Sequence, residues 1–101
     1  MIWRVTASRE AEADIADATD WYEEQRNGLG SRFLEDVRSI IELIASNPLQ
    51  YAMRYRDARR ALLHRFPYAL IFRVADSEVR LLGCFHTSRD PRRWQARVRR
   101  S

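Results

Sequence analysis

A histidine, several arginines and a group of aromatic side chains lie close together in the last third of the chain. Arg65-Phe66-Pro67-Tyr68 opens one short apolar run, His86 ends a second, and Arg89-Asp90-Pro91-x-x-Trp94 follows. An imidazole changes its charge near neutral pH, and guanidinium groups make forked contacts with phosphate or carboxylate. These residues could therefore move a proton beside a bound anion, with His86 as the first titratable candidate and His64 as the second.

The charges are unevenly distributed along the 101 residues. All 18 basic residues are arginine, and the formal net charge is +4 with a pI near 10.0. Residues 1–48 hold five arginines and ten acidic residues, whereas residues 49–101 hold thirteen arginines and four acidic residues. GC-rich coding would explain the absence of lysine but not this segregation. The basic second half is therefore expected to attract a polyanion or an acidic protein surface.

Two amphipathic helices joined by a short turn are predicted for the first half. A short strand at Ile2–Val5 comes first. Ser8 can then cap a helix that ends near Arg26, and Ser31 can cap a second helix that ends at Asn47-Pro48. In both segments the apolar residues recur every three or four positions, as on one face of a helix. The pair predicts a helical hairpin with one buried stripe on each helix.

Strands dominate the second half. Residues 49–58 are polar and irregular and predict a loop or a ragged strand. The elements predicted after them are strands at Arg60–Phe66, Tyr68–Val74 and Val79–Phe85, a hairpin turn at residues 75–78, and a short basic helix from Asp90-Pro91 to about Arg97. The order β-α-α-β-β-β with a C-terminal helix predicts one α+β domain over residues 1–101. Its architecture would be a two-layer sandwich, with the helical hairpin packed on a mostly antiparallel sheet.

The composition limits the classes of protein to which the chain can belong. One cysteine, Cys84, and two histidines are too few for a zinc site, and no glycine-rich phosphate loop is present. Cys84 has no disulfide partner in the chain and lies in an apolar run, which favours a packed side chain over a nucleophile. The sequence shows no signal peptide and no stretch of about 20 apolar residues. We therefore expect a cytoplasmic protein with no membrane span, no metal and no cofactor.

These elements and motifs resemble the RelE/ParE superfamily of toxins from bacterial type II toxin–antitoxin systems, over essentially the whole chain. The matching residues are Ala11 through Asp14-Ile15, Trp21-Tyr22-Glu23, Gly28-Leu29-Gly30-x-x-Phe33, Asn47-Pro48, Arg65-Phe66-Pro67-Tyr68 and His86-x-x-Arg89-Asp90-Pro91-x-x-Trp94. Their order and spacing resemble the ParE-like branch most, whose members are often described as plasmid stabilisation proteins.

The resemblance implies a toxin that arrests growth and is neutralised by an antitoxin encoded beside it, with which it forms a hetero-oligomer. ParE-like members poison DNA gyrase, whereas RelE-like members cleave messenger RNA on the ribosome. Gyrase inhibition is therefore the first expectation and ribosome-dependent mRNA cleavage the alternative. A non-toxic chain that only binds its antitoxin is a further alternative. By the same analogy, the helical hairpin and the sheet edge beside it are expected to contact the antitoxin.

The two activities would use different residues. An endoribonuclease needs a base, an acid and positive charge at the phosphate, for which the candidates are His86, Arg65, Arg89 and Tyr68. The chain lacks the lysines on which some RelE relatives rely, and Thr87 stands where several nuclease members carry tyrosine. The candidates for binding gyrase are Arg89, Arg92, Arg93, Trp94 and Arg97.

His86 and Trp94 each have a structural alternative. His86 could pack at the end of a strand and hydrogen-bond to a carbonyl group. Trp94 could pin the final helix to the sheet, with arginines stacked on its indole ring.

Overall fold

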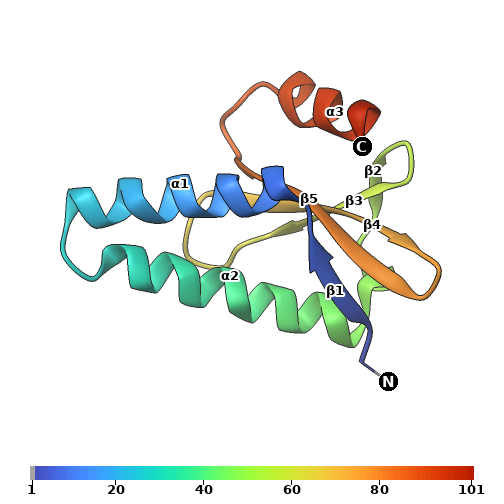
Figure 1. Cartoon of the computed structure of the whole chain (residues 1–101), viewed down its shortest axis with the longest axis horizontal. Coiled ribbons are helices and arrows are strands. Elements are labelled where there is room, and N and C mark those ends of the chain that lie inside the picture. Colours follow the sequence, from blue (N-terminus) through green and yellow to red (C-terminus); the bar gives the residue numbers. More distant parts are fainter. Residues whose placement is uncertain (1) are drawn as a thin grey trace.

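Strands and helices form an α+β fold in the computed structural model, which describes residues 2–101 (Figure 1). The elements in chain order are β1 (Arg4–Ala7), α1 (Arg9–Gln25), α2 (Leu29–Ser46), the 3-10 helix η1 (Pro48–Gln50), β2 (Met53–Tyr55), β3 (Ala58–Leu62), β4 (Tyr68–Ala75), β5 (Glu78–His86) and α3 (Pro91–Arg100). The strands form one sheet in the order β1-β5-β4-β3-β2. β1 runs parallel to β5, and all other neighbours are antiparallel. The predicted class is confirmed, and β2 is the ragged strand allowed by residues 49–58.

The sheet carries helices on both faces. α1 and α2 pack on one face over a large apolar core, which gives the two predicted layers. α3 lies on the opposite face, where Trp94 and Val98 pack against Ile71 and Leu82. Trp94 is only 8% exposed, so the prediction that it pins the last helix to the sheet is confirmed. This helix continues to Arg100, three residues beyond the predicted end.

The two ends of the helical hairpin are capped in different ways. Ser8 caps α1 as predicted, because its hydroxyl accepts a backbone N–H three residues later. The predicted cap at Ser31 is wrong, since α2 begins two residues earlier with Gly28 as its N-cap at φ +88°. The carboxylate of Glu23, near the end of α1, accepts the N–H groups of Gly28 and Gly30 at 3.0 Å each. A side chain of the preceding helix therefore replaces the expected serine.

Two strands lie at different positions from those predicted. The first strand was predicted at Ile2–Val5. β1 instead runs from Arg4 to Ala7, two residues further along the chain, where it pairs in parallel with Glu78–Leu81. β3 was expected at Arg60–Phe66, but it starts and ends earlier, at Ala58–Leu62. The segment that follows β3 is held by a side chain of α2 and cannot continue the strand.

That side chain is Asp36, which is 6% exposed. Its carboxylate accepts the backbone N–H groups of His64 at 3.1 Å, Arg65 at 2.7 Å and Phe66 at 3.2 Å. Backbone N–H groups bonded to a carboxylate are unavailable for a sheet, so β3 ends where these bonds begin. The contact ties the turn before β4 to the middle of α2.

Replacing Asp36 with alanine should destabilise the protein by about 3 kcal/mol, because three partly buried N–H groups lose a charged acceptor. Urea unfolding at neutral pH measures the change, and Glu35→Ala, an exposed neighbour on the same helix, is the matched control with an expected effect within about 0.5 kcal/mol. A loss below about 1 kcal/mol for Asp36→Ala would contradict the assigned role.

Cys84 on β5 belongs to the apolar core and is 4% exposed. Burial, with a smaller contribution from the negative charge of Asp14, raises the pKa of the thiol to about 12. A thiol with so high a pKa stays protonated at neutral pH, and the thiolate is the reactive form. The structure therefore supports the packed interpretation of this residue.

Native Cys84 should react with Ellman's reagent at pH 8 at least about 100-fold more slowly than the unfolded chain, since burial hides the thiol and raises its pKa to about 12, which suppresses the thiolate. Absorbance at early times, with and without concentrated guanidinium chloride, gives the two rates. A native rate within tenfold of the unfolded rate would show that the thiol is accessible.

Candidate functional site

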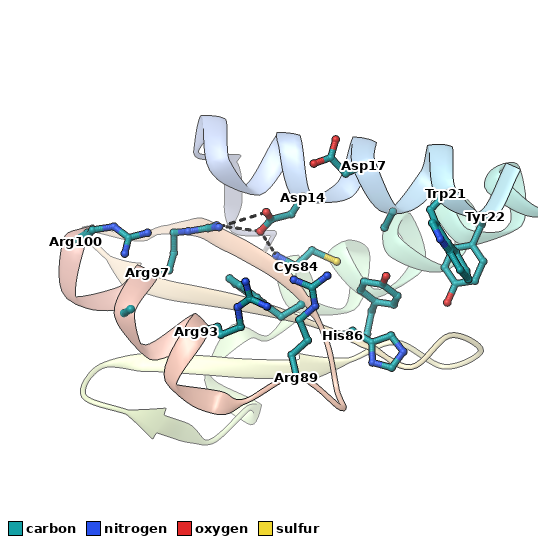
Figure 2. Close-up of a pocket in the computed structure, with 14 residues that line it drawn as sticks. Asp14, Asp17, Trp21, Tyr22, Cys84, His86, Arg89, Arg93, Arg97 and Arg100 are labelled. Carbon is teal, nitrogen blue, oxygen red and sulfur yellow. Dashed lines mark hydrogen bonds and ion pairs between the residues drawn. The ribbon is translucent and has the colours of Figure 1, made fainter. Parts of the chain in front are cut away.

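A cleft of about 870 Å³ lies between α1 and α3, with the end of β5 as its floor (Figure 2). Asp14, Asp17 and Trp21 line it from α1, and Cys84 and His86 line it from β5. The residues that line it from the C-terminal side are Arg89, Arg93, Ala96, Arg97 and Arg100. The acidic first half and the basic second half of the chain therefore meet across this cleft.

The cleft exists because β5 is longer than its neighbour β1. β1 pairs with Glu78–Leu81 only, and within residues 2–101 no strand lies beside Leu82–His86 on this edge. A β-bulge lies at the start of this uncovered segment of β5. Ile71 pairs with Gly83 and Phe72 pairs with Leu81, which leaves Leu82 as the extra residue. Backbone groups of β5 thus face the cleft instead of a neighbouring strand.

An ion pair bridges the cleft above this strand end. Arg97 donates to the two carboxylate oxygens of Asp14, at 2.9 Å from Nη1 and 3.3 Å from Nη2, and the side chains are 16% and 20% exposed. The same Asp14 carboxylate accepts the N–H of Cys84 at 3.0 Å, and Arg97 Nη1 also donates to the carbonyl oxygen of Leu82 at 2.9 Å. One pair of side chains therefore joins α1, β5 and α3.

The close approach of these groups depends on Gly83. A Cβ atom at this position would overlap the ring of Phe85 and would lie 3.0 Å from Arg97 Nη1 and 3.1 Å from Asp14 Oδ2. The guanidinium group of Arg97 also lies over the ring of Phe85, at 4.9 Å from its centroid. A side chain at residue 83 would therefore displace the ring of Phe85 and crowd the ion pair.

The arginines around the cleft differ in their partners. Within residues 2–101, Arg97 is the one cleft arginine that forms an ion pair, and Arg89, Arg93 and Arg100 form none. Arg92, one position along α3 from Arg93, instead binds Asp90 at 2.6 Å outside the cleft, and this contact lowers the pKa of Asp90. With four guanidinium groups against the carboxylates of Asp14 and Asp17, the cleft has an excess of positive charge.

Aromatic side chains and His86 line the end of the cleft farthest from Arg100 (Figure 2). Tyr68 and His86 pack edge to face with ring centroids 5.1 Å apart. Burial raises the pKa of Tyr68. Among the described residues, no carbonyl group accepts a hydrogen bond from the His86 ring: its Nδ1 instead accepts the N–H of Ser88 at 3.1 Å and lies 2.8 Å from the Ser88 hydroxyl. This contact orients the imidazole and leaves Nε2 as the nitrogen available for other chemistry.

The structure brings some of the predicted site residues together and separates others. Tyr68, His86 and Arg89 line the cleft together with Arg93 and Arg97. Arg65 lies apart from them, in a second hollow of about 180 Å³ beside Asp36 and His64. Arg92 is exposed and Trp94 is buried against the sheet.

Sequence reasoning missed Asp14, Asp17 and Trp21 as residues of the site. The available signal was the position of Asp14, which follows Ala11 by three residues in the buried stripe of α1, where an unpaired charge would be costly. Its partner Arg97 is 83 residues away in sequence, so the pair could not be assigned before the fold was known.

The described residues 2–101 also lack a metal-binding cluster and a membrane-spanning helix. No three side chains of the His, Cys, Asp or Glu type lie in an arrangement that could hold a metal ion. No described helix combines the length and the apolar character needed to cross a membrane.

The fold is similar to that of chains from two solved toxin–antitoxin systems. A chain of the chromosomal ParDE system from P. aeruginosa superimposes with a TM-score of 0.77 at 20% identity, over 86% of this chain and 98% of that chain. A chain of the RelBE2 toxin–antitoxin complex from Mycobacterium tuberculosis gives a TM-score of 0.62 at 19% identity, over 85% of this chain and 99% of that chain. Identities this low show a shared fold. A search of curated proteins found no match.

The sequence profile of the ParE toxin of the type II toxin–antitoxin system parDE matches residues 5–91. The matched residues run from the second residue of β1 to the first residue of α3. They include Asp14, Asp17 and His86, which line the cleft. The chain therefore belongs to the ParE toxin family, within the RelE/ParE superfamily of type II toxins.

Proposed function

We propose that this toxin arrests growth by binding and inhibiting DNA gyrase, and that a cognate antitoxin neutralises it. The observation that carries the proposal is that α3 bears five arginines and no acidic residue and packs against the sheet through Trp94 and Val98. Membership of the ParE family supports the same target, because ParE-like toxins act on gyrase. Plasmid stabilisation would follow as a consequence of such a toxin paired with an antitoxin.

The rigidity of α3 supports a binding function over a merely solvated basic tail. The indole of Trp94 and the side chain of Val98 are buried against the sheet, and Arg97 is held by Asp14. An arginine on a fixed helix loses less conformational freedom on binding than one on a mobile tail, so more of its interaction energy contributes to affinity. Exposed arginines on such a helix suit carboxylates on an acidic protein surface.

The predicted target-binding residues then divide into two groups. Arg89, Arg92 and Arg93 are exposed and are the proposed contacts with gyrase. Arg97 and Trp94 act by positioning, because one is committed to Asp14 and the other is buried. Substitution of either positioning residue would loosen the helix that carries the contacts.

Cleavage of mRNA is the second candidate, and one observation favours it. Tyr68, His86 and Arg89 line the same cleft, so a proton carrier, a phenol and a cation lie close together. Arg65, the fourth predicted catalytic residue, lies in a different hollow. Within residues 2–101 His86 also has no carboxylate among its hydrogen-bond partners that would stabilise a protonated imidazole. A non-toxic chain that only binds its antitoxin is the remaining alternative.

Pulse-labelling of cells induced for this chain without its antitoxin distinguishes these functions. A gyrase inhibitor blocks replication first, so labelled thymidine incorporation should fall within the first minutes while labelled methionine incorporation continues, with induction of DNA-damage signalling. Earlier loss of methionine incorporation would contradict the proposal and favour the ribonuclease. Normal growth with folded protein present would favour the non-toxic alternative.

Two variants of the same chain test which residues are responsible for the toxicity. His86→Ala should keep toxicity within about threefold, whereas the double substitution Arg92→Glu and Arg93→Glu should reduce inhibition of gyrase supercoiling at least about tenfold. Arg26→Glu with Arg38→Glu makes the same charge change on the helical hairpin and should leave inhibition unchanged. Loss of toxicity in His86→Ala with normal thermal stability would instead make His86 a catalytic residue.

A further inference from the structure

We infer that the cleft between α1 and α3 binds a nucleoside polyphosphate, with the base stacked on Trp21 and the phosphates held by Arg89 and Arg93. Such a ligand would bind the free toxin whether or not gyrase is the target. The aromatic end of the cleft, which the proposed function does not use, thereby acquires a role.

The size and walls of the cleft suit a ligand of this class. Its volume of about 870 Å³ lies within the range of roughly 300–1,000 Å³ that is typical of sites for small molecules and cofactors. α1 and α3 form the two walls, and the end of β5 forms the floor (Figure 2). A molecule bound there would therefore be enclosed by folded elements on three sides.

The aromatic end of the cleft presents an exposed indole ring. Trp21 is 54% exposed, although tryptophan side chains are on average highly buried. Tyr22 packs edge to face against it with ring centroids 5.1 Å apart, and the ring pair of Tyr68 and His86 lines the same end. A supported, exposed indole is a stacking platform for a nucleobase, and the loss of such stacking typically weakens binding by a factor of at least about five.

Guanidinium groups without ion-pair partners line the α3 wall of the same cleft. Arg89 and Arg93 are exposed, and within residues 2–101 neither forms an ion pair. Arg100 adds a third such group at the end of the cleft opposite the aromatic rings (Figure 2). Guanidinium groups make forked, charge-assisted hydrogen bonds with phosphate oxygens. A ligand that joins a flat ring to several phosphates therefore matches both parts of the cleft.

The carboxylates of the cleft are compatible with this ligand. Asp14 is neutralised by Arg97. Asp17 lies on the α1 wall one helical turn from Trp21, and among the described residues it has no ion-pair partner. A carboxylate repels phosphate but accepts hydrogen bonds from sugar hydroxyls, as acidic residues do in dinucleotide-binding folds. Asp17 is therefore assigned to the ribose, between the base and the phosphates.

Calorimetric titration of the isolated full-length chain with ATP and with GTP, in the absence of magnesium, measures the binding. The tighter of the two should have a dissociation constant below about 100 μM, and adenosine and inorganic tripolyphosphate should each bind at least about tenfold more weakly. In ¹H–¹⁵N spectra the indole N–H of Trp21 should shift during the titration, whereas that of the buried Trp94 should not.

Three results of these titrations would overturn the inference. The first is no binding of either nucleotide. The second is tripolyphosphate binding as tightly as the nucleotide, because the cleft would then recognise only negative charge. The third is tighter binding of a short single-stranded oligonucleotide than of either mononucleotide, because the cleft would then be a site for nucleic acid.

Substitutions at the two ends of the ligand separate stacking from phosphate binding. Trp21→Ala should weaken nucleotide binding at least about fivefold and leave tripolyphosphate binding within about twofold, because only stacking is lost. Arg93→Gln should weaken the binding of both at least about fivefold, because both ligands lose a phosphate contact. Trp21 and Arg93 are exposed, so both variants should fold, and an unchanged indole signal from Trp94 would verify this.

The matched control for Arg93→Gln is Arg99→Gln, which removes the same charge from α3. Arg99 does not line the cleft and donates instead to the hydroxyl of Tyr55. This variant should change nucleotide binding by less than about twofold, since the charges outside the cleft are screened by salt. Equal losses for the two arginine variants, or unchanged nucleotide binding in folded Trp21→Ala, would contradict the assigned site.

Discussion

The ion pair between Asp14 and Arg97 is the interaction on which the arrangement of this toxin depends. Its two side chains come from the first and the last helix, and both also bond to the backbone of β5. β1 is too short to cover β5, so these side chains satisfy backbone groups that a longer strand would have paired. With Gly83 leaving room for the contact, the pair holds α3 beside α1 and thereby forms the cleft.

The acidic first half and the basic second half of the sequence lie on opposite sides of the cleft. The acidic α1 and the basic α3 form opposite walls of one cleft, and a single carboxylate–guanidinium pair joins them (Figure 2). The remaining arginines keep their charge available for partners.

Local features of the sequence were predictable because their causes lie within a few residues. Ser8 caps α1 through a bond to its own first turn, and residues 75–78 form the predicted turn with Asp76 and Ser77 at positive φ. The missed features depend on contacts distant in sequence. Asp36 ends β3 from 28 to 30 residues away, and Asp14 reaches Arg97 across 83 residues. The position of Asp14 in the buried stripe of α1 indicated that it needs a partner, but the partner of neither carboxylate could be identified before the fold was known.

A double-mutant cycle on Asp14→Ala and Arg97→Ala, measured by urea unfolding, shows whether these two residues stabilise the fold as one unit. Because the pair is largely buried and also serves the strand backbone, each substitution should cost about 2–3 kcal/mol, with a coupling energy of at least about 1.5 kcal/mol. Those values would establish that the two residues act as one unit in joining α1, β5 and α3. A coupling energy below about 0.5 kcal/mol, as for an exposed surface pair, would contradict this account.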